Sequence, residues 1–197
     1  NKFGMTAEQT LKTAQSLYEQ KLITYPRVDT TFLPNDQYPK IGGILRQLTN
    51  YQELTTPLLG QKIRKSTKVF NDKKVTDHHA MIPTGLQGGV SGVNFQVYDA
   101  ITKHFIAAFY PDCSVSNTAV QAEVDSVGFK ATGKEILDEG WRVVFASKGA
   151  EVKANSEEVV MPTFVKGESG PHEPSFTEKH TKAPRTFTEA SLLRAME

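Results

Sequence analysis

The 197-residue sequence has very little cysteine, no long apolar run and almost no excess charge of either sign. Cys113 is its one cysteine, which excludes an internal disulfide framework and a cysteine-rich zinc site and favours a reducing compartment. No apolar run approaches the roughly 20 residues that a membrane-spanning helix needs. Residues 1–30 are polar and show no secretory signal pattern. We therefore expect a cytoplasmic protein that does not enter a membrane.

The charge balance limits how this chain can bind nucleic acid. Its 23 Lys and Arg residues are nearly cancelled by 22 Asp and Glu residues, which leaves a formal net charge of +1. A protein that coats DNA by charge alone is usually more basic, whereas a cleft that meets a few phosphates is compatible with this balance. Six basic residues gather in one stretch: Lys62, Arg64, Lys65, Lys68, Lys73 and Lys74. A solvated basic loop and a DNA contact explain this stretch equally well.

Two helices have clear signals in the first 111 residues. Thr6 and Gln9 have the spacing of a capping box, which predicts a helix over residues 6–20. Asn94 is the predicted cap of an amphipathic helix that ends at Pro111. Its apolar stripe is predicted to lie in the core and comprises Phe95, Tyr98, Ile101, Phe105, Ile106 and Phe109.

Weaker signals lie between these helices. We expect a short helix from near Tyr38, weakened by two glycines, and another that Pro57 opens and that runs to Leu59. Residues 68–75 are predicted to form a strand or hairpin. Residues 85–92 contain four glycines and are predicted to form a loop.

The pattern changes from helical to alternating after Cys113. Residues 118–124 and 127–131 alternate apolar with polar side chains, which predicts two strands. Further strands are expected around residues 141–145, 159–164 and within 175–182. Together with the helices, this region predicts an α+β protein.

A change in pattern near Ser114 also predicts a domain boundary. Thr188 is expected to cap a last helix, with Glu189 at its positive end. The sequence starts without methionine and stops inside this helix, so we expect it to be a piece of a longer protein.

Tyr25 lies in a segment with the residues for attack on a phosphodiester. Pro26 disfavours helical backbone at Tyr25, so the phenol is expected to be held in an extended or turn conformation. Alternate side chains of a strand share a face, so Arg27 is expected to point into the same site. A tyrosine oxygen beside a permanent cation suits phosphoryl chemistry. The alternatives are a structural Tyr-Pro pair with a half-buried ring and a surface interaction of Arg27 with Asp29.

His78 and His79 form a second candidate group, directly after Asp77. Adjacent side chains of an extended chain face opposite ways, which argues against one metal ion bound by both histidines. A protonated His78 can bind phosphate or assist proton transfer. For His79, an ordinary hydrogen-bonded loop residue is the preferred interpretation, and no metal ligands are assigned.

Three segments, in order, resemble the type IA DNA topoisomerases. ITYPRVDT, from Ile23, is similar to the active-site segment of that family, whose tyrosine becomes joined to DNA. DHHAMIPT, from Asp77, is similar to the segment whose first histidine lies near the DNA phosphates. PRTFTEASLL, from Pro184, is similar to a run that opens a helix of the domain closing the cleft. Pro26 and the histidine pair resemble the bacterial topoisomerase III branch.

The resemblance implies a domain organisation. Residues 1–114 would be a winged-helix-like catalytic domain, 115–182 part of a β-barrel-like hinge domain, and 183–197 the start of the next helical DNA-binding domain. Val28 stands where the family usually has threonine, so a hydrogen bond from that position is lost.

The resemblance also implies a reaction and its partners. Tyr25 would cleave single-stranded DNA through a 5′-phosphotyrosine, with Arg27 stabilising the phosphorus centre and with Arg27, His78 and Arg185 as DNA-binding residues. Strand passage and religation would follow without ATP. Mg²⁺ would be bound by a Toprim domain, which these 197 residues do not include. Other domains of the polypeptide are not included either. We therefore expect no cofactor in this piece and no DNA relaxation by this piece alone. The enzyme would be cytoplasmic and nucleoid-associated; a helicase partner is left open.

Two other classes compete with this interpretation. A noncatalytic DNA-binding module of the same fold predicts unchanged function after Tyr25→Phe. A metal-dependent phosphoesterase centred on His78 and Asp77 predicts a bound metal ion and no covalent protein–DNA intermediate.

Overall fold

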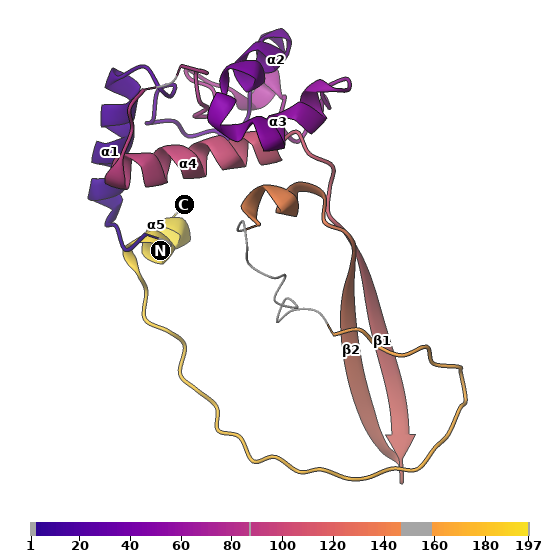
Figure 1. Cartoon of the computed structure of the whole chain (residues 1–197). Helices are drawn as coiled ribbons and strands as arrows, with labels where there is room; N and C mark the ends of the chain where they lie inside the picture. Colours follow the sequence, from indigo (N-terminus) through magenta and orange to yellow (C-terminus); the bar gives the residue numbers. More distant parts are fainter. Residues whose placement is uncertain (1–2, 87, 147–158, 197) are drawn as a thin grey trace. The chain divides into compact units, whose positions relative to one another are not determined.

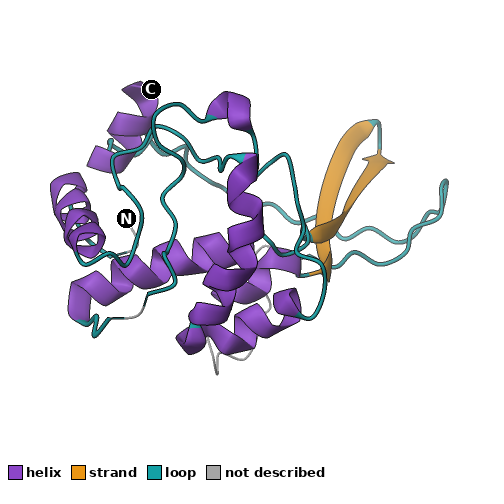
Figure 2. Cartoon of the chain, turned by 90° about the horizontal axis from the view of Figure 1, so that it is seen from above, coloured by secondary structure: helices purple, strands orange, loops and turns teal. Residues whose placement is uncertain are grey.

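The computed structural model of the chain describes residues 3–86, 88–146 and 159–196. The chain divides into two compact units: Asn1–Asp112 with Glu139–Lys148, and Cys113–Asp138 with Gly149–Glu197. Helices dominate the first unit and an antiparallel pair of strands the second (Figures 1 and 2). The chain is therefore α+β, as predicted. In the part that the structure describes, no helix combines the length and apolarity needed to cross a bilayer.

The first helix, α1 (Ala7–Glu19), begins where the capping box predicts. The Thr6 side chain accepts a hydrogen bond from the Gln9 N–H at 3.1 Å, and the Gln9 side chain accepts one from the Thr6 N–H at 3.0 Å. Leu17 in the last turn is fully buried. This helix packs on α4 (Gly92–Ala107), which anchors its C-terminal end in the core (Figure 1).

The long helix α4 starts earlier than predicted. Ser91 is its N-cap and Asn94 lies in its first turn. That turn is mostly exposed, and Phe95 itself is 46% exposed, so the buried face begins at Val97, two residues after the start of the predicted stripe. Ile101 is half-buried and packs on the core. The buried positions of α4 are Val97, Tyr98, Thr102, Phe105 and Ile106, and Phe109 is buried just after the helix.

Two shorter helices follow α1. The helix α2 (Tyr38–Gln47) starts at the predicted residue. The helix α3 (Gln52–Leu59) begins before Pro57, which lies inside it rather than opening it. Burial of Thr55 and Leu58 on one face favours the helix enough to tolerate the hydrogen bond that proline cannot donate.

Residues 68–75 form neither the predicted strand nor a hairpin. Phe70 makes one isolated parallel bridge with Leu33, and the chain then enters a short 3-10 helix, η3 (Asp72–Lys74). The Asn71 side chain accepts a hydrogen bond from the Lys73 N–H at 3.2 Å. This local side-chain cap competes with strand pairing and turns the chain.

The second unit contains the predicted pair of strands, β1 (Ser114–Val124) and β2 (Val127–Asp138). They are antiparallel and joined through Asp125 and Ser126, which both have positive φ, at 48° and 66°. Positive φ at both central residues matches the right-handed twist of a hairpin.

The remaining predicted strands are wrong. Residues 141–145 lie in a 3-10 helix, η4 (Gly140–Phe145), where the Trp141 and Phe145 rings meet with centroids 5.9 Å apart. Of residues 159–164, Val159 alone pairs, in one isolated bridge with Lys134. Residues 175–182 form no strand. These runs have the composition of strands, but residues 141–145 pack on α4 instead, and among the described residues the 159–164 run meets the edge of β2 only at the Val159 bridge.

The last helix, α5 (Glu189–Met196), starts after Thr188 as predicted. The Ser191 N–H donates a hydrogen bond to Thr188 Oγ1 at 3.2 Å. The other short 3-10 helices of the described residues are η1 (Asn35–Gln37) and η2 (Thr49–Tyr51).

Candidate active site

The segment that carries Tyr25 is held by hydrogen bonds to residues 77–84. The Thr24 N–H donates to the Ile82 carbonyl at 2.9 Å. In return, the Ile82 N–H donates to Thr24 Oγ1, also at 2.9 Å. These two residues are 58 positions apart in the sequence. The chain fold therefore fixes the backbone immediately before Tyr25 against the histidine segment.

The same two segments are tied again farther along the chain. The Ala80 N–H donates to the Phe32 carbonyl at 2.9 Å, and Thr30 Oγ1 donates to the Lys74 carbonyl at 2.6 Å. Both ends of the loop that follows Tyr25 are thus pinned to the chain on either side of His78.

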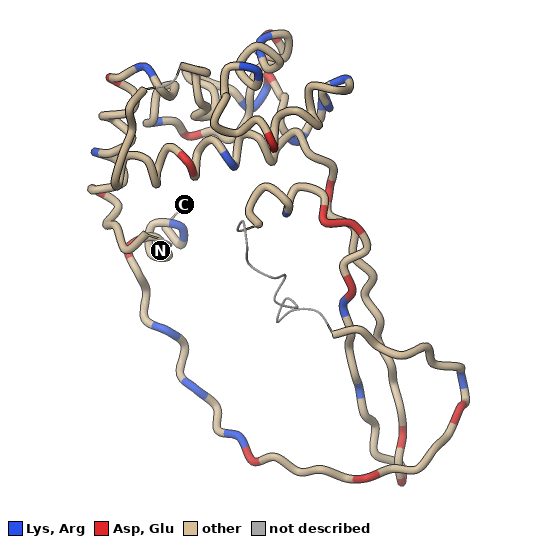
Figure 3. Tube along the Cα trace, viewed as in Figure 1, with Lys and Arg blue, Asp and Glu red and all other residues tan. Residues whose placement is uncertain are grey.

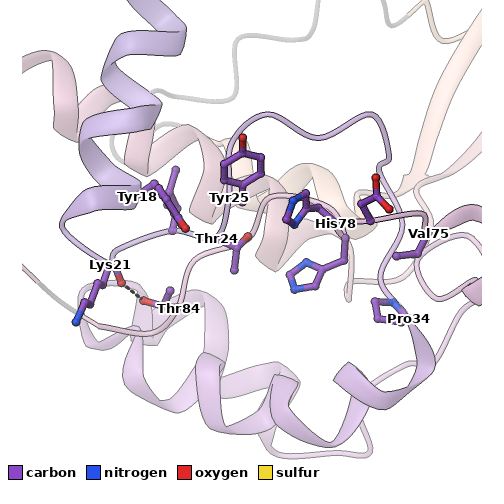
Figure 4. Close-up of a pocket in the computed structure, with 11 residues that line it drawn as sticks. Tyr18, Lys21, Thr24, Tyr25, Pro34, Val75, His78 and Thr84 are labelled. Carbon is purple, nitrogen blue, oxygen red and sulfur yellow. Dashed lines mark hydrogen bonds between the residues drawn. The ribbon is translucent and has the colours of Figure 1, made fainter.

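These bonds place Tyr25 beside His78. Their ring centroids are 4.5 Å apart with planes inclined by 38°. The Tyr18 ring, from the last turn of α1, meets Tyr25 edge-on with centroids 5.5 Å apart. Figure 4 shows the Tyr25 and His78 rings side by side, with the Tyr25 hydroxyl directed away from Thr24. The phenol is held by rings on two sides.

An open cavity of about 550 Å³ surrounds these rings. Tyr25 is half-buried and His78 is exposed, so a polymer can reach both. The described residues that line the cavity are Tyr18, Lys21, Ile23, Thr24, Tyr25, Pro34, Val75, Asp77, His78, His79 and Thr84.

Arg27 is exposed and is not among the described residues that line this cavity. The expected convergence of Tyr25 and Arg27 on one site is therefore not seen. Nor does Arg27 pair with Asp29 in the described part of the chain, where Asp29 accepts a hydrogen bond from Thr76 Oγ1 at 3.3 Å. The loop curves after Pro26, so alternation along a straight strand does not apply.

Val28 lines a second cavity, of about 600 Å³. Met81 and Phe105 are among the apolar side chains around it. A valine methyl suits this environment, whereas a threonine hydroxyl there would need a partner.

His78 and His79 both line the Tyr25 cavity, although alternation in an extended chain would separate them. The chain bends at Asp77 and His78, which removes that alternation. His79 Nδ1 lies 2.8 Å from the Ala80 carbonyl, which can only accept, so this nitrogen carries the hydrogen. Among the described residues, no three His, Cys, Asp or Glu side chains gather as a metal site.

Comparison with known proteins decides the family. The family model described as DNA topoisomerase matches residues 1–197. The chain belongs to the DNA topoisomerase family. It is 35% identical to DNA topoisomerase 3 of Bacillus licheniformis and 33% identical to that of Bacillus subtilis, over 100% of this chain and 28% of each relative. It is 34% identical to DNA topoisomerase 3 of Bacillus thuringiensis, with the same coverage. It is thus a type IA, topoisomerase III-like chain that spans about 28% of these relatives' length.

Arg185 of this topoisomerase chain lies in the second unit, in an exposed segment before α5. Tyr25, Arg27 and His78 lie in the first unit. The DNA contact assigned to Arg185 stays a prediction.

Some residues of the basic stretch of this topoisomerase chain make contacts with other residues of the first unit. Arg64 and Lys68 both pair with Asp112, at 3.0 and 3.1 Å. These bonds and charges, led by the Arg64 hydrogen bond, lower the pKa of the Asp112 carboxyl. The Lys74 ammonium lies 4.7 Å from the centroid of the Phe32 ring. Figure 3 shows Lys and Arg positions interspersed with Asp and Glu positions along the trace of the first unit. A structural role is thus favoured for Arg64 and Lys68.

Sequence reasoning missed four residues around Tyr25. Tyr18 lies within the predicted helix over residues 6–20 and was given no role in the site. Lys21, Thr24 and Thr84 were given no role, although Lys21 and Thr24 flank the tyrosine in sequence. Thr84 Oγ1 donates to the Lys21 carbonyl at 2.7 Å, a long-range bond that no local pattern could reveal.

Proposed function

We propose that Tyr25 is the nucleophile of a type IA DNA topoisomerase and that this chain is its tyrosine-bearing part. The observation that carries the proposal is the stacking of Tyr25 on His78 in an open cavity, built by the two segments that resemble the family's active-site motifs. Relatives named DNA topoisomerase 3, of which this chain spans 28%, support the longer enzyme.

The proposed reaction exchanges one phosphodiester for another. Tyr25 Oη attacks a backbone phosphorus of single-stranded DNA, an O–P bond forms, and the P–O3′ bond breaks. The phenol gives up its proton, and the departing 3′ oxygen takes one up, so protons balance. The 5′ phosphate remains on Tyr25 until the 3′ hydroxyl attacks it and reseals the strand. Bond energy is conserved, and ATP is not needed.

Two side chains complete the proposed chemistry. His78 would contact the phosphates beside Tyr25, because its ring lies against the tyrosine. A protonated imidazole there would bind DNA or assist proton transfer once the DNA is bound. Arg27 is exposed on a long, flexible side chain, and in the DNA complex it would reach the phosphate that Tyr25 attacks. Its guanidinium fork matches phosphate oxygens and would offset the charge that builds up.

Mg²⁺ is implied by the family, but the described residues of this chain do not fit it. They offer no cluster of three carboxylate, histidine or cysteine side chains, and Mg²⁺ prefers several oxygen ligands in octahedral geometry. The proposed chemistry of this chain therefore uses no metal ion. We assign Mg²⁺ binding to a Toprim domain elsewhere in the protein. We assign strand passage to the whole enzyme, in the bacterial cytoplasm and nucleoid.

We also retain the proposed domain roles. A winged-helix-like catalytic domain is supported by the helix-rich first unit, and a β-barrel-like hinge by the long hairpin of the second. The helix after Arg185 would begin the next DNA-binding domain.

Transfer of a DNA label tests the proposal. The full-length protein that carries this chain is incubated with a single-stranded oligonucleotide labelled at its 3′ end, then denatured. The label is expected to stay on the protein and to map to the peptide with Tyr25. Tyr25→Phe should abolish the adduct, whereas Tyr38→Phe, outside the cavity, should keep it.

The competing interpretations give other results. An adduct that survives Tyr25→Phe would refute the assigned nucleophile. Unchanged function of the variant would favour a noncatalytic DNA-binding module. Metal-dependent cleavage without any adduct would favour a phosphoesterase centred on His78 and Asp77.

A further inference from the structure

Lys21 has a backbone conformation that is unfavourable for lysine. It follows the end of α1 with φ of 61°. Its N–H donates to the Tyr18 carbonyl at 2.8 Å, and the Leu22 N–H donates to the Leu17 carbonyl at 3.0 Å. This pair of bonds is a Schellman motif, whose left-handed position usually holds glycine because a Cβ is strained there. Local stability thus favours glycine at position 21.

Lys21 lines the cavity that contains Tyr25. It is the one Lys or Arg among the described residues of the lining. The Lys21 carbonyl accepts a hydrogen bond from Thr84 Oγ1 at 2.7 Å, which fixes the backbone at this edge of the cavity. Figure 4 shows the side chain on the side of Tyr18 and Thr84, directed away from Tyr25. The residue is exposed, and its side chain is placed for a group beside the reacting centre, not at it.

A backbone phosphate is the group that matches this position. Single-stranded DNA that lies over Tyr25 extends past the cavity edge and presents further phosphates there. We propose that Lys21 binds a phosphate next to the one that Tyr25 attacks and thereby sets the path of the strand through the cavity. This inference rests on the proposed function of Tyr25. Strain at a non-glycine residue is then explained by the charge that its side chain supplies.

Substitutions at position 21 separate charge from backbone strain. Lys21→Gly removes both, Lys21→Gln removes the charge alone, and Lys21→Arg keeps the charge. Lys12→Gln, on the exposed face of α1 and outside the lining, is the matched control. Binding of a fluorescent single-stranded oligonucleotide by the full-length protein that carries this chain is measured by anisotropy over a range of salt concentrations.

The expected results differ among the variants. Lys21→Gly and Lys21→Gln should each weaken binding about 5–10-fold at about 50 mM salt and reduce the salt slope by about 0.7, the value of one phosphate contact on a single strand. Lys21→Arg and Lys12→Gln should bind like the parent chain. Lys21→Gly should also raise the melting temperature, by about 2 °C, as relief of strain outweighs the flexibility of glycine.

A chemical measurement avoids any dependence on folding of the variants. Acetylation of lysine amines, followed by mass spectrometry, should show protection of Lys21 by the oligonucleotide and no protection of Lys12. Parent-like binding and salt slope of Lys21→Gln, or equal acetylation with and without DNA, would overturn the proposal. So would a parent chain that binds no oligonucleotide. A Tyr25 adduct that forms in the full-length protein while these tests fail would reject the role of Lys21 alone.

Discussion

Thr24→Val tests whether the hydrogen bonds between the two motifs hold Tyr25 in place. The substitution keeps the branched shape of the side chain but removes the acceptor of the Ile82 N–H, which is bonded at 2.9 Å. Ile82 is 5% exposed, so its N–H would lose a partner where water is scarce. A buried donor without a partner costs about 1–3 kcal/mol.

Two smaller effects set the net change. The bond from Thr24 Oγ1 to the Ala80 carbonyl, at 3.5 Å, is too long to contribute much. The extra methyl of valine in this half-buried position recovers a few tenths of a kcal/mol. We therefore expect Thr24→Val to lower the free energy of unfolding by about 1–2 kcal/mol. Thr24→Ser, which keeps the hydroxyl, should lower it by less.

Urea denaturation followed by the fluorescence of Trp141, which belongs to the same unit, measures this difference. Formation of the phosphotyrosine adduct by the full-length protein should also fall in the valine variant and be retained in the serine variant. If the Thr24→Val protein is as stable as the Thr24→Ser protein and forms the adduct as well as the parent, the idea that this bond fixes Tyr25 against His78 is refuted.

Two further predictions concern stability. An alanine Cβ at Gly140, where φ is 51°, would lie 2.6 Å from the Pro111 carbonyl oxygen, so Gly140→Ala is expected to lower the free energy of unfolding by about 2 kcal/mol. Gly43 in α2 has open space around it, so Gly43→Ala should raise the free energy of unfolding by about 0.5–1 kcal/mol. Equal urea midpoints for the two variants would contradict this. Burial, followed by the charge of Asp99, raises the pKa of Tyr51. The stability that the raised pKa provides is present below the unfolded value of about 10 and is lost as pH rises past it. Between about pH 8 and pH 11 in urea titrations, Tyr51→Phe should therefore lose less stability than the parent chain, and identical losses would show the prediction to be wrong.

The sequence predicted elements whose signals lie within one turn or one hairpin. The capping box at Thr6 and the cap at Thr188 gave correct helix starts, because each depends on a bond over three residues. The alternation after Cys113 predicted the hairpin correctly, because its two strands are adjacent in sequence and pair with each other. Around residues 141–145, composition favoured a strand, but this segment packs on α4 and forms a 3-10 helix instead.

The sequence by itself also determined which chemical groups are available: a tyrosine ahead of proline, an arginine and then a histidine pair, in the order of the motifs that resemble the topoisomerase family. Only the tertiary structure decided which of them meet. Tyr25 and His78 come together through bonds between segments more than 50 positions apart, while Arg27, only two residues from Tyr25, lies outside the cavity lining. The physical reason is that local periodicity sets side-chain direction only while the backbone stays regular, and here long-range hydrogen bonds and core burial bend it.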